Sequence, residues 1–501
     1  MTETGGPAIT PLSVLRNSAK LSGANLASAL AGFLAYMYVA RVLGPEMLGV
    51  SGFLMLWLFY ANLLRPGLFS AAMREMPHLL GQGKAEEARR IQNVALTVEV
   101  PYVLLPVTVM LFASLSYSVP VIRHGLPLIA LAYLLMSVRD FVGGIHGIHR
   151  RFGLQARVVL VSNLVAQVFV VASVRWLGIY SVLLDRAVAA TVALTVYRLI
   201  APPLRYAVVW GGPEARRLLH IGLPMTLLGV FYWGFRTVDQ TLIAVWLPFA
   251  ALGYFTFALN FANLARLLVS DFGNVLAPVL FGELGRRGGA EALGAEAARI
   301  VVFLVAATSF GVNAGQAALG PLVLHYLPRF APAVPVVEGL IFVVPLAAAA
   351  LVPSILLNSV SLNRQRLHAV VWGAGLALNA LLGTVALRYL HWGPSGVAWA
   401  TVTSQMAITA GLFAATHRYL AGRRRDRGAL YGGMLGLLAV AALVFIVLHV
   451  RALAAHGAWL SSLAFRLACV AAAWAGAAAV AYGWWRWFLG SSGHPEQLDA
   501  V

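Results

Sequence analysis

Long apolar stretches alternate with short polar connections along almost the whole chain. Each stretch is long enough for a helix to cross the hydrocarbon core of a bilayer, which takes about 20 residues. The pattern therefore predicts an all-α integral membrane protein with about fourteen transmembrane helices, and no connection approaches the size of a soluble domain. The stretches cover approximately residues 21–40, 48–72, 94–115, 119–138, 154–174, 179–200, 218–241, 251–281, 300–323, 335–357, 367–388, 394–416, 430–449 and 459–485.

A weak internal repeat organises these helices. Shifting the chain by 204 residues aligns Gly49 with Gly253 and Phe53 with Phe257, and it moves the first predicted helix onto the seventh. Six helices per half preserve orientation, which predicts two parallel six-helix bundles around a central cavity, an arrangement that several transporters use. The predicted domains are residues 1–200, residues 218–420, an additional helix pair at 430–485 and a cytoplasmic tail at 486–501.

Composition narrows the class of protein. Of 501 residues, 60% are hydrophobic and 11% are charged, whereas soluble domains carry about 25% charged residues. This excludes a water-soluble enzyme. The single cysteine, Cys469, excludes a disulfide-stapled secreted scaffold. The polar segment 1–13 has no basic region typical of a cleavable signal peptide.

The net charge of +18 is explained mainly by membrane topology. With the N-terminus in the cytoplasm, 25 basic residues fall in inner segments and 7 in outer ones. Cytoplasmic loops collect Lys and Arg, so both termini are expected in the cytoplasm, and a nucleic-acid partner is not needed to explain the charge. Four arginines fall inside predicted helices instead: Arg65, Arg236, Arg266 and Arg466.

Polar residues form stripes on the first two predicted helices of each half. Such groups are costly in hydrocarbon and usually face a bundle interior or a wet cavity. For the uncharged members, interhelical hydrogen bonding is an equally good explanation, whereas Arg65, Arg236 and Arg266 favour a cavity. The stripes include Asn25 and Tyr36 on the first helix, Asn62 on the second, Trp233 and Gln240 on the seventh, and Asn260 and Asn263 on the eighth.

Two intramembrane carboxylates stand out. Asp239 follows Arg236 by three residues, so it either neutralises that arginine or forms a titratable or cation-binding coupling site. Asp271 is a second coupling candidate, and Glu99 is expected at the membrane interface. The histidines lack metal-ligand spacing, no nucleophile motif occurs, and neither a metal site nor a cofactor is predicted.

A set of short motifs recurs in the two halves of the chain: Tyr38–Gly49, Arg65–Glu75, Gly222–Pro224, Asp239, Leu252–Tyr254 and Pro278. Together these segments resemble the polysaccharide and O-antigen flippases of the multidrug/oligosaccharidyl-lipid/polysaccharide exporter superfamily. The resemblance covers approximately residues 12–420 and is strongest before residue 92. Fourteen-helix relatives in the superfamily include the lipid II flippases.

The resemblance implies a flippase, not an enzyme, in the bacterial inner membrane. Its cargo would be a polyprenyl-diphosphate-linked oligosaccharide, moved to the periplasmic leaflet by alternating access for surface polysaccharide such as the lipopolysaccharide O-antigen. Implied partners are membrane lipids, a polysaccharide polymerase and other assembly proteins. Arg236, Arg266 and Arg65 would bind the diphosphate, with Arg41 at the outer mouth. The sugar path would be lined by Asn25, Tyr36, Asn62, Trp233, Gln240, Asn260 and Asn263.

Three other functions stay open on the sequence. A lipid II flippase is the nearest alternative, and the segment Arg41–Gly49 weakly favours polysaccharide export over it. A cation-coupled multidrug antiporter shares the fold, but a more acidic and aromatic cavity is expected there. A membrane glycosyltransferase, O-antigen polymerase or ligase usually carries a large outer loop, and no outer connection here is long enough.

Overall fold

The computed structural model describes residues 11–148, 152–201, 204, 206–287, 294–359, 364–420, 424–452, 466–468 and 470–475. Within these residues the secondary structure is helical, without a β-strand. Nine of the described helices are long and apolar enough to cross a membrane, or ten if the bent helix α7 counts as one span. The predicted all-α membrane class is confirmed, and the total of about fourteen crossings stays a prediction.

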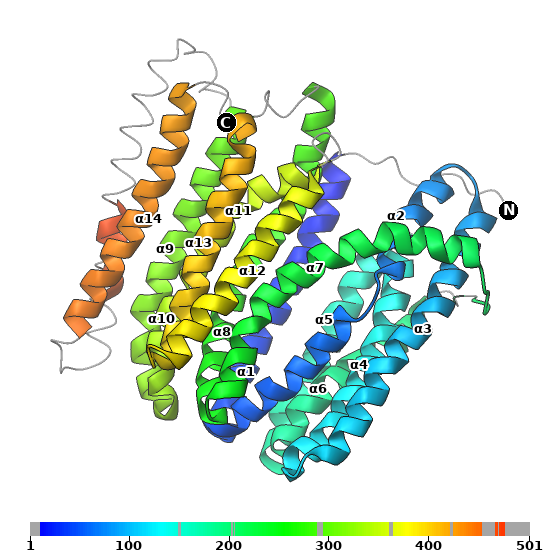
Figure 1. Cartoon of the computed structure of the whole chain (residues 1–501), viewed down its shortest axis with the longest axis horizontal. Helices are drawn as coiled ribbons and strands as arrows, with labels where there is room; N and C mark the ends of the chain where they lie inside the picture. Colours follow the sequence, from blue (N-terminus) through cyan, green and yellow to red (C-terminus); the bar gives the residue numbers. More distant parts are fainter. Residues whose placement is uncertain are drawn as a thin grey trace. The chain divides into compact units, whose positions relative to one another are not determined.

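Most predicted apolar stretches correspond to one helix each (Figure 1), whereas the stretch at 335–357 is divided between α10 and α11. α7 is bent by 42° between its arms, Gly212–Leu223 and Thr226–Trp246. The predicted helix at 459–485 lies mostly outside the described residues, as does the tail at 486–501. The elements are α1 (Pro11–Leu63), α2 (Leu68–Gly81), α3 (Ala85–Ser116), α4 (Pro120–Ile148), α5 (Phe152–Leu177), α6 (Ile179–Ile200), α7 (Gly212–Trp246), α8 (Phe249–Arg287), α9 (Gly294–Tyr326), η2 (Pro328–Ala333), α10 (Val334–Leu340), α11 (Val343–Asn358), α12 (Gln365–Arg388), α13 (Gly393–Leu420) and α14 (Arg424–Ala452).

The chain divides into two compact units. Unit 1 contains Met1–Asn260 and Ala369–Ala400, and unit 2 contains Phe261–His368 and Thr401–Val501. The long helices α8, α12 and α13 each contribute to both units. The predicted halves, residues 1–200 and 218–420, divide the chain by its sequence repeat, whereas the two units divide it by contacts. The predicted halves therefore stay a prediction.

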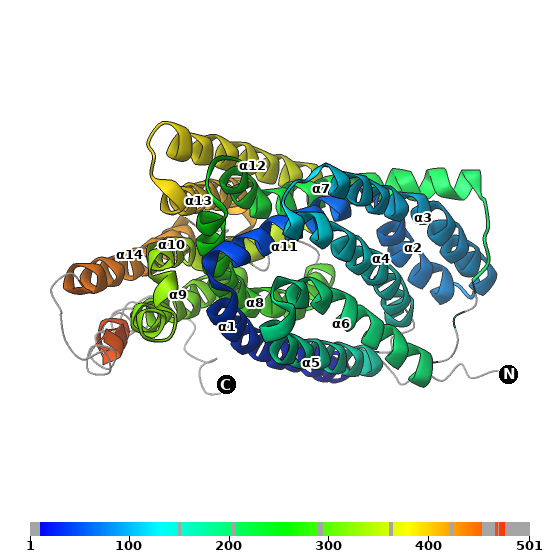
Figure 2. The same cartoon turned by 90° about the horizontal axis from the view of Figure 1, so that it is seen from below.

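In unit 1, α3, α4, α5 and α6 run side by side, and α1 packs along α5 (Figures 1 and 2). Leu54, Leu126, Ile129 and Leu183 form part of the core between α1, α4 and α6. Other large apolar side chains of these helices, such as Phe112, are exposed. A helix that is apolar all round belongs either in a protein core or in a membrane, so these outward faces suit contact with lipid.

In unit 2, α9 packs against α11 and α14. Hydrogen bonds of the buried Asn313 join α9 to the C-terminal segments. Its Nδ2 donates to the carbonyl of Ala441 at 3.1 Å, and its Oδ1 accepts from Trp474 Nε1 at 3.0 Å. Buried amides gain most when such bonds are made. The predicted additional C-terminal helices are thus represented by α14 and residues 470–475, packed within unit 2.

The predicted single helix at 48–72 is wrong. Helix α1 ends at Leu63 and α2 begins at Leu68, with Pro66 and Gly67 between them. Gly67 has a φ of 74°, a left-handed conformation that glycine adopts without steric cost. A hydropathy pattern does not register this break because the residues on both sides are apolar. We call residues 64–67 the elbow.

Helix α1 is kinked at Gly44, which has the non-helical dihedral angles φ 74° and ψ 175°. Just after this kink, α1 crosses the start of α8 at close range within unit 1. A Cβ at Gly49 would collide with the carbonyl oxygen of Phe249, and a Cβ at Gly253 would collide with that of Pro45. Phe249 and Gly253 lie 204 residues after Pro45 and Gly49, so the contact is reciprocal under the sequence repeat. The two backbones can approach this closely only because both positions lack a side chain.

Candidate functional site

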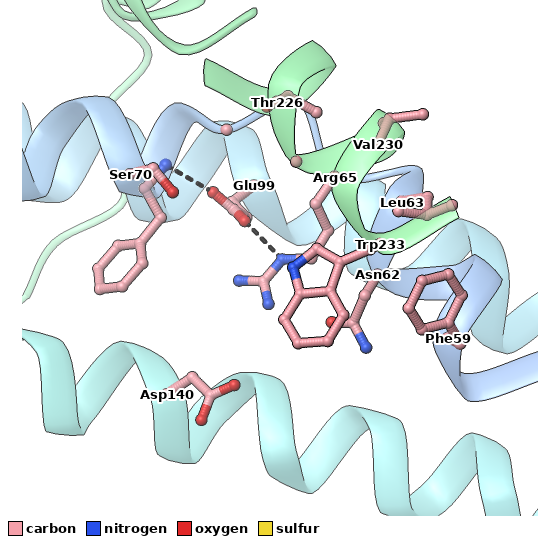
Figure 3. Close-up of a pocket in the computed structure, with 13 residues that line it drawn as sticks. Phe59, Asn62, Leu63, Arg65, Ser70, Glu99, Asp140, Thr226, Val230 and Trp233 are labelled. Atoms are coloured by element: carbon pink, nitrogen blue, oxygen red, sulfur yellow. Dashed lines mark hydrogen bonds and ion pairs between the residues drawn. The ribbon is translucent and has the colours of Figure 1, made fainter. Parts of the chain in front are cut away.

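A cavity of about 560 Å³ lies within unit 1, where the end of α1 meets α2, α3, α4 and α7 (Figure 3). It joins a basic, two acidic, several polar and several aromatic side chains. The lining residues are Phe59, Asn62, Leu63, Arg65, Gly67, Phe69, Ser70, Glu99, Asp140, Thr226, Gly229, Val230 and Trp233.

Glu99 of α3 holds the elbow. Arg65 Nε donates to Glu99 Oε1 at 2.8 Å, and the backbone N–H of Phe69 donates to Glu99 Oε2 at 2.9 Å (Figure 3). Phe69 lies in the first turn of α2, where backbone N–H groups have no partner within the helix. The carboxylate, only 5% exposed, therefore neutralises an arginine and caps a helix at once.

The elbow is fixed from its other side by α7. A Cβ at Gly67 would meet Thr226 Oγ1 and the carbonyl oxygen of Gly222, and a Cβ at Gly222 would meet the carbonyl oxygen of Gly67. The backbones of the elbow and α7 are thus in direct contact. This packing, together with the Glu99 bond, holds Arg65 at the cavity wall.

Trp233 of α7 provides an aromatic wall. Its side chain is 46% exposed and packs edge-on against Phe59, with ring centroids 6.1 Å apart. The guanidinium carbon of Arg236 lies 5.0 Å from the centroid of the Trp233 ring, within cation–π range. Asn62 of α1 also lines the cavity, and its Nδ2 donates to the backbone carbonyl of Leu58 at 2.9 Å. An aromatic face beside amides and an arginine can bind a sugar joined to an anionic group.

Four predicted site residues therefore meet here: Arg65, Asn62 and Trp233 line the cavity, and Arg236 lies against Trp233. The expected position of Glu99 at the membrane interface stays a prediction, and the structure adds that its side chain is buried against Arg65. Its signal was a carboxylate inside the apolar stretch 94–115, the same feature that identified Asp239.

Asp140 is the second acidic residue that lines the cavity, and it was not identified from the sequence. It follows the apolar stretch 119–138, so it reads as part of a polar connection. In the structure α4 continues to Ile148, and this carries Asp140 to the cavity wall, where it is bonded to Arg139 at 2.7 Å.

Three other predicted sugar contacts lie around Thr256 in α8. Gln240 Nε2 donates to Thr256 Oγ1 at 3.3 Å, and Asn260 Nδ2 donates to the Thr256 carbonyl at 2.8 Å. The ring of Tyr36 stacks on Phe257, with centroids 6.2 Å apart. The Gln240 bond joins α7 to α8, which is the interhelical role that the polar stripes left open.

Asp239 lies deep in unit 1 and is 2% exposed. Its Oδ1 accepts a hydrogen bond from Asn379 Nδ2 of α12 at 2.7 Å. Among the described residues, no three Asp, Glu, His or Cys side chains gather as a metal site requires.

The remaining predicted site residues are spread more widely. Arg41 is exposed on α1, and Asn263 and Arg266 are partly buried on the part of α8 that belongs to unit 2. The side chains of Asn25 and Asp271 lie outside the described part of the structure. The roles assigned to these five residues stay predictions.

Solved transporter structures share this fold. A structure of the lipid II flippase MurJ in an inward closed conformation has a TM-score of 0.68 and 13% identity, covering 92% of this chain and 98% of that one. An inward-facing multidrug resistance MATE transporter of the MOP superfamily has a TM-score of 0.62 and 15% identity, covering 78% and 94%. A MOP superfamily transporter from Pyrococcus furiosus has a TM-score of 0.57 and 14% identity, covering 80% and 95%.

Sequence comparison identifies the family. No curated protein matches the chain. Residues 14–282, more than half of the chain, match the family described as polysaccharide biosynthesis protein. The structural neighbours are a lipid II flippase and transporters, and at 13–15% identity they show that this chain has their fold. With the cavity, the helical fold and this match in agreement, the chain belongs to the polysaccharide biosynthesis protein family.

Proposed function

We propose that this protein flips a polyprenyl-diphosphate-linked oligosaccharide from the cytoplasmic to the periplasmic leaflet of the bacterial inner membrane. The observation that carries the proposal is the joint placement of Arg65 and Trp233 on one cavity of about 560 Å³. Family membership and the MOP-type fold support a flippase or exporter in polysaccharide biosynthesis. The product would serve a surface polysaccharide such as the O-antigen.

The chemistry of the cargo matches the side chains in and beside this cavity. A diphosphate needs charge-assisted hydrogen bonds in a low-dielectric site, and a guanidinium supplies them in a planar fork. Arg65 offers such a group, and Arg236 lies against the aromatic wall. Trp233, Phe59 and Asn62 offer the stacking face and the amide that sugars bind. Arg266 and Arg41 would contact the diphosphate at other stages of transport.

The expected topology supports cargo entry from the cytoplasm. If both termini are cytoplasmic, the elbow with Arg65 and the last third of α4 with Asp140 lie toward the side where the cargo is made, and Glu99 reaches them from the middle of α3. Alternating access would then carry it outward. Membrane lipids, a polysaccharide polymerase and other assembly proteins are the partners that this function needs.

We assign the coupling role to Asp239, with Asp271 as the second candidate. A buried intramembrane carboxylate is costly and is often a site for a proton or a cation. The burial of Asp239 and its bond to Asn379 support this role, because the charge is held between helices of one unit.

A lipid II flippase is the second candidate. The MurJ structure covers 92% of this chain, whereas the inward-facing MATE structure covers 78%. The larger overlap favours lipid flipping over multidrug antiport. It does not distinguish a polysaccharide unit from a peptidoglycan precursor, because both are polyprenyl-diphosphate-linked.

Deletion and complementation test the proposal. The deletion strain should accumulate completed, unpolymerised lipid-linked sugar units on the cytoplasmic side and should lose surface polysaccharide. Wild-type protein should restore the polysaccharide, and Arg65→Ala should not, although it still inserts. The control is Arg123→Ala, an exposed arginine outside the cavity.

The alternatives predict different phenotypes. Loss of peptidoglycan precursor export with normal surface polysaccharide would identify a lipid II flippase. Normal surface glycan with altered drug susceptibility would identify an antiporter and overturn the proposal.

A further inference from the structure

We infer that Glu99 is an exchangeable counter-ion: its carboxylate occupies an anion site, formed by Arg65 and the N-terminus of α2, for which the diphosphate of the cargo competes. This inference rests on the proposed function. It adds to that function the carboxylate of Glu99, the backbone N–H of Phe69 and an exchange of anions on Arg65.

The carboxylate of Glu99 occupies a site built from two kinds of donor. One oxygen accepts from Arg65 Nε at 2.8 Å, and the other accepts from the Phe69 backbone N–H at 2.9 Å. Guanidinium groups and amides in the first turn of a helix are the donors that phosphate sites use. Both donors point at a single anion, and in the structure that anion belongs to the protein.

This site opens onto space that a larger anion can enter. Arg65, Phe69 and Glu99 all line the cavity of about 560 Å³, together with Trp233 and Asn62. Glu75, by contrast, pairs with Arg217 at 2.8 Å and is not among the lining residues. Both pairs join an arginine to a carboxylate, but only the Glu99 pair lines the cavity that contains Trp233 and Asn62, whereas Arg217 lines a separate pocket on α7.

The charges on the cavity wall make the competition necessary. Arg65 is balanced by Glu99, and the carboxylate of Asp140 is bonded to Arg139. With Glu99 seated on Arg65, the lining therefore has no uncompensated positive charge for a diphosphate. Two anions on one guanidinium repel each other strongly where water is scarce. A diphosphate at Arg65 therefore competes with Glu99 for the same positive charge and weakens the Glu99 contact.

The competition gives Glu99 a role in release as well as in binding. In the empty protein the carboxylate keeps Arg65 in place and satisfies the α2 amide, so neither donor is left unpaired in a buried setting. When Arg65 returns to Glu99, the cargo loses its counter-ion. A protein without this carboxylate should hold a diphosphate more tightly and release it more slowly.

The experiment measures binding of farnesyl diphosphate to the purified full-length protein. Gln has the shape of Glu, and its carbonyl oxygen can still accept from Phe69, while its NH2 group cannot accept from Arg65 Nε. Glu99→Gln therefore removes the charge and frees Arg65, and it keeps the α2 amide satisfied. We expect Glu99→Gln to bind farnesyl diphosphate about tenfold more tightly, which corresponds to ~1.4 kcal/mol. Farnesol, which has no phosphate, should bind both proteins equally.

Two variants separate competition from a general structural effect. Glu75→Gln removes the matched carboxylate outside the cavity and should leave the affinity for farnesyl diphosphate unchanged. In an Arg65→Ala background, Glu99→Gln should give no gain, because the donor under competition is gone. In cells, Glu99→Gln should transport more slowly despite its tighter binding, a separation that a purely structural role would not produce.

Equal or weaker binding of farnesyl diphosphate by Glu99→Gln would overturn the inference. If Glu99→Gln does not accumulate, Glu99→Asp serves instead, since its shorter side chain cannot reach both donors. It should also bind more tightly, and unchanged affinity would count against the inference. If wild-type protein bound no farnesyl diphosphate, or bound it independently of Arg65, the proposed function would fail at this site. Arg65-dependent binding without a gain in Glu99→Gln would sink only the role of Glu99.

Discussion

Trp233 is the largest exposed aromatic side chain on the wall of the cavity, and Arg236 lies across its ring. Replacing it with alanine removes both the stacking surface and the cation–π contact. We expect Trp233→Ala to weaken binding of the lipid-linked sugar roughly tenfold, since such contacts contribute about 0.5–2 kcal/mol. Trp233→Phe should retain most of the affinity. Binding to purified protein measures both effects.

Trp246 is a suitable control for this prediction. It lies on the same helix, is similarly exposed, and does not line the cavity. Trp246→Ala should leave the affinity unchanged. Equal losses for Trp233→Ala and Trp246→Ala would contradict an aromatic wall for the sugar.

Asp239 allows a separate prediction about energy coupling. Asp239→Asn removes the charge but keeps an oxygen that can accept from Asn379. If this carboxylate couples transport to a cation, the variant should insert normally, bind cargo and lose gradient-driven transport. The measurement is uptake into proteoliposomes with and without an imposed proton or sodium gradient. A variant that responds to the gradient as wild type does would return Asp239 to a structural role.

At the scale of elements, the helices were more predictable than the joints between them. The apolar stretch at 300–323 became α9 and that at 367–388 became α12, because hydropathy alone determines which segments suit a bilayer. The elbow was missed, whereas the predicted break between 21–40 and 48–72 is present as a kink inside α1, where Gly44 has the non-helical dihedral angles φ 74° and ψ 175°. Such joints depend on single Pro and Gly residues and on the helix packed against them.

The crossing at Gly49 and Gly253 leads to a prediction at this scale. Gly49→Ala would place a methyl group into the backbone at Phe249, so α1 and α8 would have to separate. We expect a loss of stability of about 3 kcal/mol or more, measured as a lower Tm in detergent or as poor accumulation. Gly311→Ala is the control, because nothing lies near its added Cβ. Gly311→Ala should be neutral or mildly stabilising, since alanine favours helix. Equal Tm values for Gly49→Ala and wild type would contradict the close crossing.

At the scale of the whole molecule, the distribution of basic residues predicts the orientation in the membrane. Cys469 is the single cysteine of the chain, so Cys469→Ser gives a background for site-specific labelling. In intact cells, a membrane-impermeant maleimide should label Arg123→Cys from the periplasm. Lys84→Cys should react only after the inner membrane is permeabilised. The reverse pattern would invert the topology and with it the direction of cargo entry.

The family and fold of the molecule were accessible from sequence, but the composition of the site was only partly so. Helical periodicity placed Asn62, Arg65, Trp233 and Arg236 on polar stripes, and in the structure the first three line one cavity. Periodicity also grouped Tyr36, Gln240 and Asn260 with them, whereas they meet around Thr256 and Phe257. A stripe gives the angle of a residue about its own helix and does not say which helix faces it.

The sequence by itself determined that this is a helical membrane protein, because hydropathy is local and additive along the chain. Tertiary structure alone decided which charges meet. Arg65 and Glu99 are 34 residues apart and on different helices, and each read alone is an isolated ion near a membrane surface. Their pairing depends on the elbow at Gly67, on its contact with Gly222 and on the register of α3 beside α2. Those features come from packing between elements, which no local pattern encodes.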